Sequence, residues 1–485
     1  MKSIVKKNPS LLIYIFIFLL TFLTQFSSIE KEVIDWDEST FYVVSNYVSS
    51  GNILYVDYWD GKPPLIFIYL AIFFKIFGAN LIVGRLAGDL LIYLSAVLTF
   101  KILKLSFNNL VSFTSVTFLI YLYSYEASQP TMTEHLGVFF IVLFFYLYLE
   151  KTIFSNYFVY GLLFSLAFNT RNNLGFAALG FFIYLLIERK LTLKKFLNLI
   201  FGFLLPILVL SLYFFLNDSF QNYFYMLFKF PLQISTYRMT YSEIVIEINN
   251  KLNLENFISI ELIVITFLIF TLFFVFKFNL NSYLIFKLNF WLFAFIFLSI
   301  VAGGKIYNHY IIQLFPFIAI FIAFGINIFF KKDYLLTALI LITLLINLNY
   351  LTKGFVNLVN YKEIYENYPI KKVSNFVDSF NVDDKILLAL ENHLIFFYNK
   401  NLTSLKVVHP SNLPNTERYN LILSSLTDLG LTYNDEFKTL LQNKPNFIFC
   451  ENECNLYLSK DFYIYNYDLV YELEDLKLYK KINDE

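Results

Sequence analysis

The sequence predicts a polytopic α-helical membrane protein with a small extracytoplasmic α/β domain at its C-terminal end. Two observations lead to this fold class. Hydrophobic residues make up 58% of the 485 residues, aromatic residues make up 21%, and the mean hydropathy is +0.59, which is too apolar for a soluble protein. Apolar stretches of membrane-spanning length recur as far as residue 350, and charged residues and asparagines return after it.

Membrane-spanning helices are predicted wherever an apolar stretch approaches the roughly 20 residues that cross the hydrocarbon core, which gives about 11 crossings. The two helices that flank Asn169 are shorter than the others. The predicted helices cover residues 11–26, 81–103, 110–125, 133–149, 157–168, 174–187, 196–216, 257–276, 284–301, 310–330 and 334–350.

Lysine and arginine gather in alternate turns between these helices, for example at Lys101, Lys104 and Arg189. Positive charge marks cytoplasmic turns, so we expect a cell-membrane protein with a cytoplasmic N-terminus and an extracytoplasmic first loop and C-terminus. This alternation requires that the apolar run KPPLIFIYLAIFFKIFG, residues 62–78, lies at or dips into the membrane surface without crossing it.

The chain changes character near residue 350, where short apolar runs such as KILLAL and PNFIFC begin to alternate with polar turns. We therefore divide it into a membrane domain, residues 1–350, with a first outer loop over residues 27–80, and a C-terminal domain, residues 351–485. The C-terminal domain shows no catalytic pattern and is interpreted as a lid or acceptor-binding platform. Its Cys450 and Cys454 are either a small disulfide or two inert thiols.

Several classes of function are disfavoured. A formal net charge of +0 gives no basic field for nucleic acid. The chain contains no phosphate-binding P-loop, zinc-protease, serine-hydrolase or dinucleotide-binding motif, so no cofactor is expected. Few ionisable residues fall in the middle of the predicted helices, which weighs against a proton-coupled transporter.

The densest group of charges lies between residues 30 and 64, in EKEVIDWDESTFYVVSNYVSSGNILYVDYWDGKPP, although the whole chain is only 15% charged. The run FYVVSNYV predicts a helix along the membrane surface, and the acids before it lie at its N-terminal end, where the helix dipole favours them. The two prolines after Lys62 hold this lysine in an extended conformation, which makes it a candidate phosphate ligand.

The motifs DWDEST, YVDYWDGKPPL, KIFGAN and GRLAGD occur in this order after the first helix. Together they resemble the first extracytoplasmic loop of the GT-C superfamily of membrane glycosyltransferases, in the branch of protein O-mannosyltransferase-like and aminoarabinose transferase-like enzymes (glycosyltransferase family 39-like). The resemblance implies a catalytic domain over residues 1–350. It implies a polyprenyl-phosphate sugar as donor, with an envelope lipid, glycan or protein as acceptor, all within the surrounding membrane lipid.

Sugar transfer to a hydroxyl requires a base, and the resemblance assigns this role to Asp37, the first acid of the Asp-Glu pair, with Glu38 as a second catalytic candidate. Asp35 is the alternative base or a substrate ligand. The alternative to a catalytic role, for either aspartate, is a purely structural role as the N-cap of the following helix. Asp35-Trp36-Asp37 is also a DxD sequence, which holds a metal in nucleotide-sugar enzymes; no metal site is assigned here, and a divalent ion is left open.

The leaving polyprenyl phosphate needs fixed cations at the membrane surface. The resemblance assigns phosphate contact to Lys62. Arg85 in GRLAGD is a further candidate, and its alternative is an ion pair with Asp89. Arg171 in NTRNN is a third candidate, and its alternative is an interfacial arginine that extends its charge to water.

Two later segments complete the predicted site. Glu134 follows Thr133 in a predicted outer turn, where the resemblance places an acid that orients the acceptor or supports the base; a plain helix start is the alternative. GGKIYNHYIIQLFP resembles the HYxxxLxP segment of the family, so Lys305, His309 and Tyr310 are candidate ligands of the lipid phosphate or the sugar. The alternative is an aromatic belt residue pair at the membrane interface.

The sequence therefore predicts an inverting glycosyltransferase (EC 2.4) with Asp37 as base. A lipid-linked sugar flippase or transporter, and a non-catalytic subunit of an envelope glycan assembly complex, are the alternatives from other classes. The donor sugar, the acceptor, the prenyl chain length, the metal dependence and the oligomeric state are left open.

Overall fold

A computed structural model shows the chain as two compact units. The helical unit consists of Met1–Ser28, Leu86–Tyr213 and Ile234–Leu358, and the loop-and-sheet unit consists of Ile29–Arg85, Phe214–Gln233 and Val359–Glu485. The division of the chain at residue 350 stays a prediction. The structure describes residues 9–125, 128–129, 131–151, 156–234, 284–303, 307–330, 332–380, 385–399, 402–403, 406, 408–409, 444–451 and 466–482.

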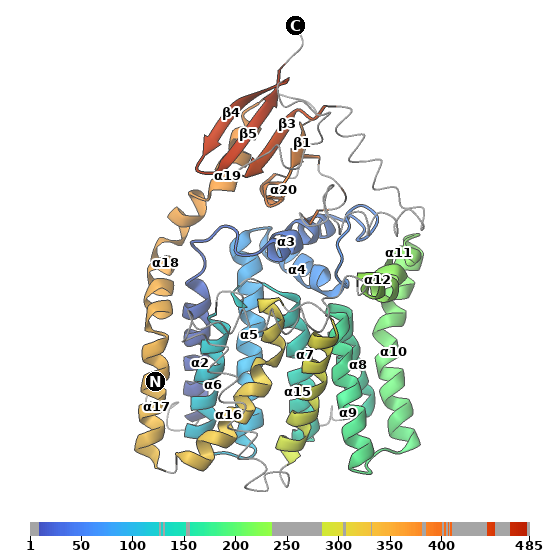
Figure 1. The fold of residues 1–485 in the computed structure, drawn as a ribbon, viewed down its shortest axis with the longest axis vertical. Helices are drawn as coiled ribbons and strands as arrows, with labels where there is room; N and C mark the ends of the chain where they lie inside the picture. The colour runs from blue at the N-terminus through green and yellow to red at the C-terminus, as the bar shows by residue number, and fades with distance from the viewer. Residues whose placement is uncertain are drawn as a thin grey trace. The chain divides into compact units, whose positions relative to one another are not determined.

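The helical unit is built of apolar helices joined by short turns (Figure 1). Its helices follow the predicted ones closely except for α18, which runs on past the predicted domain boundary at residue 350, and the helix predicted over residues 257–276 lies outside the described residues. They are α2 (Pro9–Phe26), α5 (Leu81–Lys104), α6 (Asn109–Tyr123), α7 (Thr133–Glu150), α8 (Tyr157–Thr170), η2 (Asn172–Gly175), α9 (Phe176–Ile187), α10 (Leu193–Leu216), α15 (Leu284–Ala302), η7 (Asn308–Leu314), α16 (Phe315–Phe329), α17 (Asp333–Ile346) and α18 (Leu348–Glu366). Of these, α5, α10 and α18 each continue into the other unit.

The lengths of these helices make the chain a multi-pass membrane protein. Among the described residues, α5, α7, α10, α15 and the continuous η7–α16 are long and apolar enough to cross a membrane. The bent pair α17 and α18 counts as a sixth span if it is taken as one, and α2, α6, α8 and α9 are shorter apolar helices. The predicted helix 334–350 is thus interrupted at Asn347, whose side-chain amide donates to the carbonyl of Thr343 at 2.8 Å.

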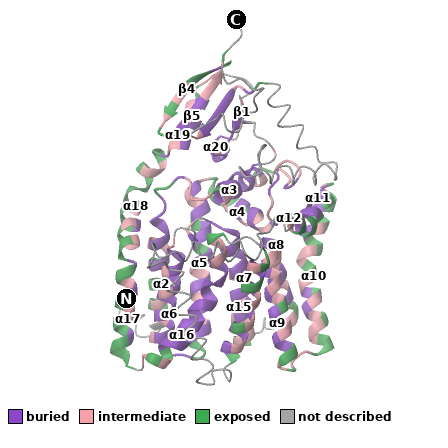
Figure 2. Cartoon of the chain, viewed as in Figure 1, coloured by how far each residue is buried: buried purple, intermediate pink, exposed green. Residues whose placement is uncertain are grey.

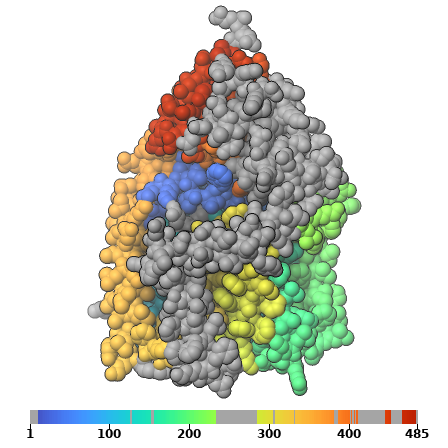
Figure 3. All heavy atoms as spheres, viewed as in Figure 1, coloured from blue at the N-terminus to red at the C-terminus, as the bar shows by residue number. Residues whose placement is uncertain are grey.

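The core of the helical unit forms where small residues let helices approach closely. A Cβ atom on Gly161 of α8 would lie 2.0 Å from the carbonyl oxygen of Leu199, and one on Gly202 of α10 would lie 1.9 Å from that of Phe158. Small residues at such crossings are typical of membrane helices. α10 lies at the surface (light green in Figure 3) and is largely exposed or intermediate (Figure 2). Its exposed apolar side chains include Phe201 and Leu208, as expected for a lipid-facing surface.

The loop-and-sheet unit carries the small α/β domain that the C-terminal sequence predicts. Its sheet has the order β2-β1-β3-β5-β4, in which β1 pairs in parallel with β2 and β3, while β5 pairs antiparallel with β3 and β4. Cys450 in β3 is buried and disulfide-bonded. The strands are β1 (Lys385–Ala389), β2 (Leu402–Thr403), β3 (Phe447–Glu451), β4 (Tyr467–Leu473) and β5 (Leu476–Lys481).

The first helix of this unit is α3 (Trp36–Ser49). Ten consecutive residues of α3, Glu38 to Tyr47, are buried, so no face of this stretch is left open. Within its unit, α4 and α20 pack against it. The position of this helix along the membrane surface stays a prediction. The other helices of this unit are α4 (Leu65–Phe77), α11 (Phe220–Phe224), η3 (Tyr225–Lys229), α12 (Phe230–Ile234), α19 (Pro369–Asp378) and α20 (Ile395–Tyr398).

The apolar run after Lys62 forms α4, which has 13 residues. At 1.5 Å per residue it spans about 20 Å, less than the roughly 30 Å of a hydrocarbon core. It buries Phe67, Leu70 and Phe74 within its unit and exposes Ile76 and Phe77. Its length fits the prediction that this segment does not cross the membrane.

Candidate active site

The N-terminus of α3 places the two aspartates of the loop in different roles. Asp35 has an extended backbone and its Oδ1 accepts a hydrogen bond from the backbone N–H of Asp37 at 2.8 Å, so it is the N-cap of the helix. Burial, and then the negative charge of Asp37, raise the pKa of Asp35 to about 6. Asp35 therefore has the structural role of a helix N-cap, and its role as a substrate ligand stays a prediction.

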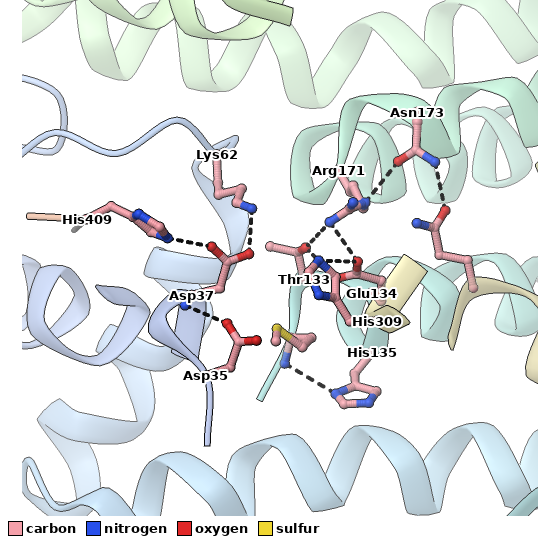
Figure 4. Close-up of polar contacts among 12 residues, drawn as sticks. Asp35, Asp37, Lys62, Thr133, Glu134, His135, Arg171, Asn173, His309 and His409 are labelled. Carbon is pink, nitrogen blue, oxygen red and sulfur yellow. Dashed lines mark hydrogen bonds and ion pairs between the residues drawn. The ribbon is translucent and has the colours of Figure 1, made fainter. Parts of the chain in front are cut away.

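Asp37 lies between two basic side chains (Figure 4). Nζ of Lys62 is 2.7 Å from its Oδ2, and Nε2 of His409 is 2.9 Å from its Oδ1. The side chains of Lys62 and Asp37 are 19% and 13% exposed, so this pair is partly open to solvent. The structure thus brings together the predicted base and the predicted phosphate ligand.

The turn that carries Lys62 is held by its own unit. Tyr55 donates its hydroxyl proton to the carbonyl oxygen of Lys62 at 2.6 Å, and its own carbonyl accepts from Nδ2 of Asn222 at 2.8 Å. Tyr55 has a φ of 68°, a left-handed conformation that is uncommon for a non-glycine residue and is found where surrounding contacts enforce it. Gly61 packs against the ring of Phe230, which a Cβ atom would approach to 2.6 Å. These contacts fix the backbone from which the lysine side chain extends.

His409 is a residue of this site that the sequence did not reveal. It is buried at the end of a C-terminal segment, and the backbone N–H of Trp59 donates to the carbonyl of Lys406 in the same segment at 2.7 Å. The only available signal was that His409 is one of four histidines in the chain and ends the apolar run LKVVH. Because it lies 372 positions from Asp37, no local pattern could join the two.

Glu38 and Arg85 form a second, buried ion pair in the same unit. Nη2 of Arg85 is 3.1 Å from Oε2 of Glu38, and Tyr42 donates to Oε1 of Glu38 at 2.9 Å. Arg85 also donates to the carbonyl oxygens of Lys31 and Glu32, at 2.7 and 3.1 Å. Both side chains are almost fully buried, so the geometry favours a role in holding the loop against the start of α5 over direct substrate contact. The catalytic role of Glu38, the phosphate role of Arg85 and its alternative pair with Asp89 stay predictions.

The helical unit holds a separate polar cluster at the N-terminal end of α7 (Figure 4). Nη1 of Arg171 is 2.7 Å from Oε1 of Glu134 and donates to Oγ1 of Thr133 at 3.0 Å. The guanidinium carbon of Arg171 lies 4.2 Å from the ring centroid of Tyr310, and Nε2 of His309 is 3.8 Å from Oε1 of Glu134. Four predicted site residues therefore meet from the ends of α7, α8 and η7.

Amide side chains extend this cluster to α15. Asn173 accepts from Nε of Arg171 at 3.0 Å and donates to Oε1 of Gln313 at 2.8 Å and to Oγ of Ser299 at 2.9 Å. Asn173 lies in the motif NTRNN and Gln313 in the segment HYIIQLFP. The sequence analysis singled out both segments but did not name these two residues as part of the site. Lys305 lies outside the described residues.

The donor set around the DxD sequence does not resemble a metal site. Within the part of the chain that the structure describes, no group of three histidine, cysteine or acidic side chains is suited to hold a metal ion. Asp35 turns back onto the backbone of α3, and Asp37 is already neutralised by Lys62. A divalent ion would have to displace both of these contacts.

The membrane-spanning helices, the small sheet domain and the charged loop after the first helix can be compared with known proteins. A family model described as dolichyl-phosphate-mannose-protein mannosyltransferase matches residues 61–214. This match covers the Lys62 turn and the helices as far as α10, including Glu134 and Arg171.

Solved structures show the same fold. ArnT from Cupriavidus metallidurans bound to undecaprenyl phosphate is similar with a TM-score of 0.66 and 11% identity, over 98% of this chain and 99% of that chain. ArnT from the same organism in the apo state is similar with a TM-score of 0.64 and 10% identity, over 98% of each chain. A comparison with curated protein sequences gave no match. The chain thus has the fold of ArnT, and residues 61–214 match the mannosyltransferase family model, in agreement with the resemblance carried by the loop motifs.

Proposed function

We propose that this protein transfers a sugar from a polyprenyl-phosphate donor to an acceptor hydroxyl on the extracytoplasmic face of the cell membrane, with Asp37 as the base. The observation that carries the proposal is the 2.7 Å pair between Asp37 and Lys62. A carboxylate suited to proton abstraction and an ammonium suited to phosphate neutralisation come from one loop. The match to a structure that holds undecaprenyl phosphate supports a lipid phosphate as the leaving group.

The reaction needs a proton acceptor and a stabilised leaving group at the same time. Asp37 takes the proton of the acceptor hydroxyl while the oxygen of that hydroxyl bonds to the anomeric carbon. The bond between that carbon and the phosphate oxygen breaks, and the phosphate keeps the electron pair. The ammonium of Lys62 stabilises this charge. A single displacement of this kind inverts the anomeric configuration.

The pairing of Lys62 with Asp37 links donor binding to the strength of the base. A neighbouring ammonium stabilises a carboxylate and makes it a weaker base. When an anionic lipid phosphate competes for Lys62, Asp37 loses part of this stabilisation and becomes a better proton acceptor. The enzyme is then fully basic only when the donor is present.

Glu134 and Arg171 serve this reaction by holding three helix ends in place. Glu134 is fully buried, so its influence on an acceptor is transmitted through Thr133 and Arg171. An extracytoplasmic position of the C-terminal domain is supported by the disulfide at Cys450, because disulfides persist in oxidising compartments.

The test is a transfer assay with purified protein, radiolabelled polyprenyl-phosphate hexoses and a membrane-extract acceptor. Asp37→Asn and Lys62→Ala are compared with two matched controls, Glu30→Gln in the same loop and Lys75→Ala on α4, both exposed positions. Transfer by the wild type and the controls, without transfer by Asp37→Asn and Lys62→Ala, supports the proposal. Retention of the donor's anomeric configuration in the product contradicts the mechanism.

The same assay separates the alternatives. If the wild type binds labelled lipid without transferring the sugar, the protein is a transporter or an accessory subunit. A flippase moves labelled lipid across reconstituted vesicles even as Asp37→Asn.

A further inference from the structure

The C-terminal segment contributes a side chain to the carboxylate that we propose as the base. Nε2 of His409 lies 2.9 Å from Oδ1 of Asp37, whereas Nζ of Lys62 lies 2.7 Å from Oδ2 of the same carboxylate. His409 and Asp37 are both in the loop-and-sheet unit, so this contact is internal to one compact body. The C-terminal domain is therefore more than the lid or platform that its sequence suggests.

The chemistry of the pair determines which atom carries the hydrogen. Asp37 beside the ammonium of Lys62 is ionised, and an ionised carboxylate only accepts hydrogen bonds. Nε2 of His409 must therefore carry a proton and donate it to Oδ1, both in the neutral ring and in the imidazolium. The carboxylate of Asp37 accepts from Lys62 through Oδ2 and from His409 through Oδ1, so each oxygen has a basic partner.

The position of His409 is fixed by packing at two points. The 2.7 Å bond from the N–H of Trp59 to the carbonyl of Lys406 ties its segment to the loop, and the neighbouring Val408 is fully buried. Earlier in the same segment, Phe397 packs against Tyr42 of α3 and Phe74 of α4, with ring centroids 5.9 and 5.4 Å apart.

Two charged or titratable groups near His409 bear on its state. Asp37, which also pairs with Lys62, contacts it from the loop, and His393, in the segment before α20, is close enough to interact with it electrostatically. Burial, and then the proximity of His409, lower the pKa of His393 to about 3, so that ring stays neutral.

We propose that His409 is a positioning residue for Asp37: its Nε2–H bond holds the carboxylate plane in the orientation in which it receives the acceptor proton. This inference rests on the proposed role of Asp37 as base. The acceptor proton passes to Asp37 and leaves to solvent after product release, and His409 itself takes up no proton. A proton relay through His409 is the competing possibility, and it needs a ring that can be protonated.

Three substitutions separate these possibilities. The side-chain amide of His409→Gln places an N–H donor near the position of Nε2 without a titratable ring. His409→Asn places its amide near the position of Nδ1, too short to reach Asp37, and His409→Ala removes the donor. We expect His409→Ala and His409→Asn to lower kcat about 10- to 100-fold, the usual cost of losing an orienting partner, with KM for the donor unchanged. We expect His409→Gln to retain kcat within a few-fold of the wild type.

A double-mutant cycle with Asp37→Asn completes the test, with the unfolding midpoint of each purified variant as the check of folding. If His409 acts through Asp37, His409→Ala lowers kcat in the wild type and has no further effect on the residual rate of Asp37→Asn. Loss of activity in His409→Gln equal to that in His409→Ala overturns the positioning role, and so does an unchanged kcat in His409→Ala. If Asp37→Asn itself transfers normally, the proposed function fails; if only the His409 variants behave normally, this inference fails alone.

Discussion

Two ion pairs of equal length lie in different surroundings in this protein. Lys62 and Asp37 in the loop-and-sheet unit, and Arg171 and Glu134 in the helical unit, each meet at 2.7 Å. The side chains of Lys62 and Asp37 are 19% and 13% exposed, whereas Arg171 is 11% exposed, Glu134 is 0% exposed, and Arg171 is shared with Thr133 and Asn173. We call the first the exposed pair and the second the buried pair, because only the second has a partner without contact to solvent. Opening the exposed pair costs less, because breaking the buried pair leaves the charge of Glu134 without solvent. The distance alone thus does not separate a reactive pair from a structural one; the surroundings do.

The largest expected effect is on activity, at the exposed pair. Asp37→Asn removes the base and should lower the transfer rate about 10²- to 10⁴-fold, because general base catalysis contributes this much. The unfolding midpoint in detergent should stay that of the wild type, since Asp35, not Asp37, caps α3. Loss of membrane insertion in Asp37→Asn would assign Asp37 to structure and remove the contrast between the two pairs.

The buried pair should show the opposite behaviour. Glu134→Gln leaves Arg171 buried without its counter-charge and should destabilise the protein by about 3–5 kcal/mol in chemical unfolding. Adding Arg171→Gln should recover part of the loss, because the two positions are coupled. Glu30→Gln, at an exposed position, is the control. A change in unfolding free energy below about 1 kcal/mol for Glu134→Gln would place Glu134 with the reactive groups.

Lys62→Ala tests how far the exposed pair matters for folding. We expect its effect on unfolding to stay within about 1 kcal/mol, as for exposed ion pairs. Binding of labelled polyprenyl phosphate should weaken about 10- to 100-fold, the value of a charge-assisted hydrogen bond. Lys75→Ala should change neither measurement. Unchanged lipid binding in Lys62→Ala would mean that the phosphate is held elsewhere.

A buried acid in the loop-and-sheet unit adds a pH dependence. Glu32 accepts from the backbone N–H groups of Ile370 and Lys371 at 2.7 and 3.0 Å, and burial, outweighing these bonds, raises its pKa to about 7. The folded state then binds a proton more tightly than the unfolded state. Stability should fall as the pH rises from about 4.5 to 7, by up to about 1.4 kcal/mol per pH unit.

Glu32→Gln should flatten this slope in unfolding midpoints measured across the same pH range. In Glu32→Gln, Asp35 still has a pKa raised to about 6, so stability should still fall as the pH rises towards 6, with a smaller slope. A stability that rises with pH in both proteins would contradict the prediction.

Chelation should have the smallest effect. Asp35 caps α3 and Asp37 pairs with Lys62, so we propose that transfer proceeds without a bound divalent ion. Treatment of the wild type with EDTA should leave the transfer rate unchanged. A rate that falls with EDTA and returns with added Mg²⁺ or Mn²⁺ would show that the exposed pair opens to a metal.

The fold class was predictable because its causes are local in the sequence. A membrane crossing is a continuous apolar stretch, so the helices could be located from length and composition. The C-terminal strands follow from short apolar runs between polar turns, as KILLAL and PNFIFC became β1 and β3. Asp37, Lys62 and Glu134 were candidates because short motifs around them resemble those of a known family and because charged residues are conspicuous in so apolar a chain.

Only the tertiary structure decided which of these charges meet. Asp37 joins His409 across 372 positions, while Arg85 joins Glu38 across 47. No sequence period or fixed spacing predicts either contact, because each depends on how segments far apart in the chain pack together. The sequence by itself determined where the apolar helices run and which residues are ionisable. The fold decided which ion pair is buried and which is open, because burial is a property of the packed neighbours and not of the residue.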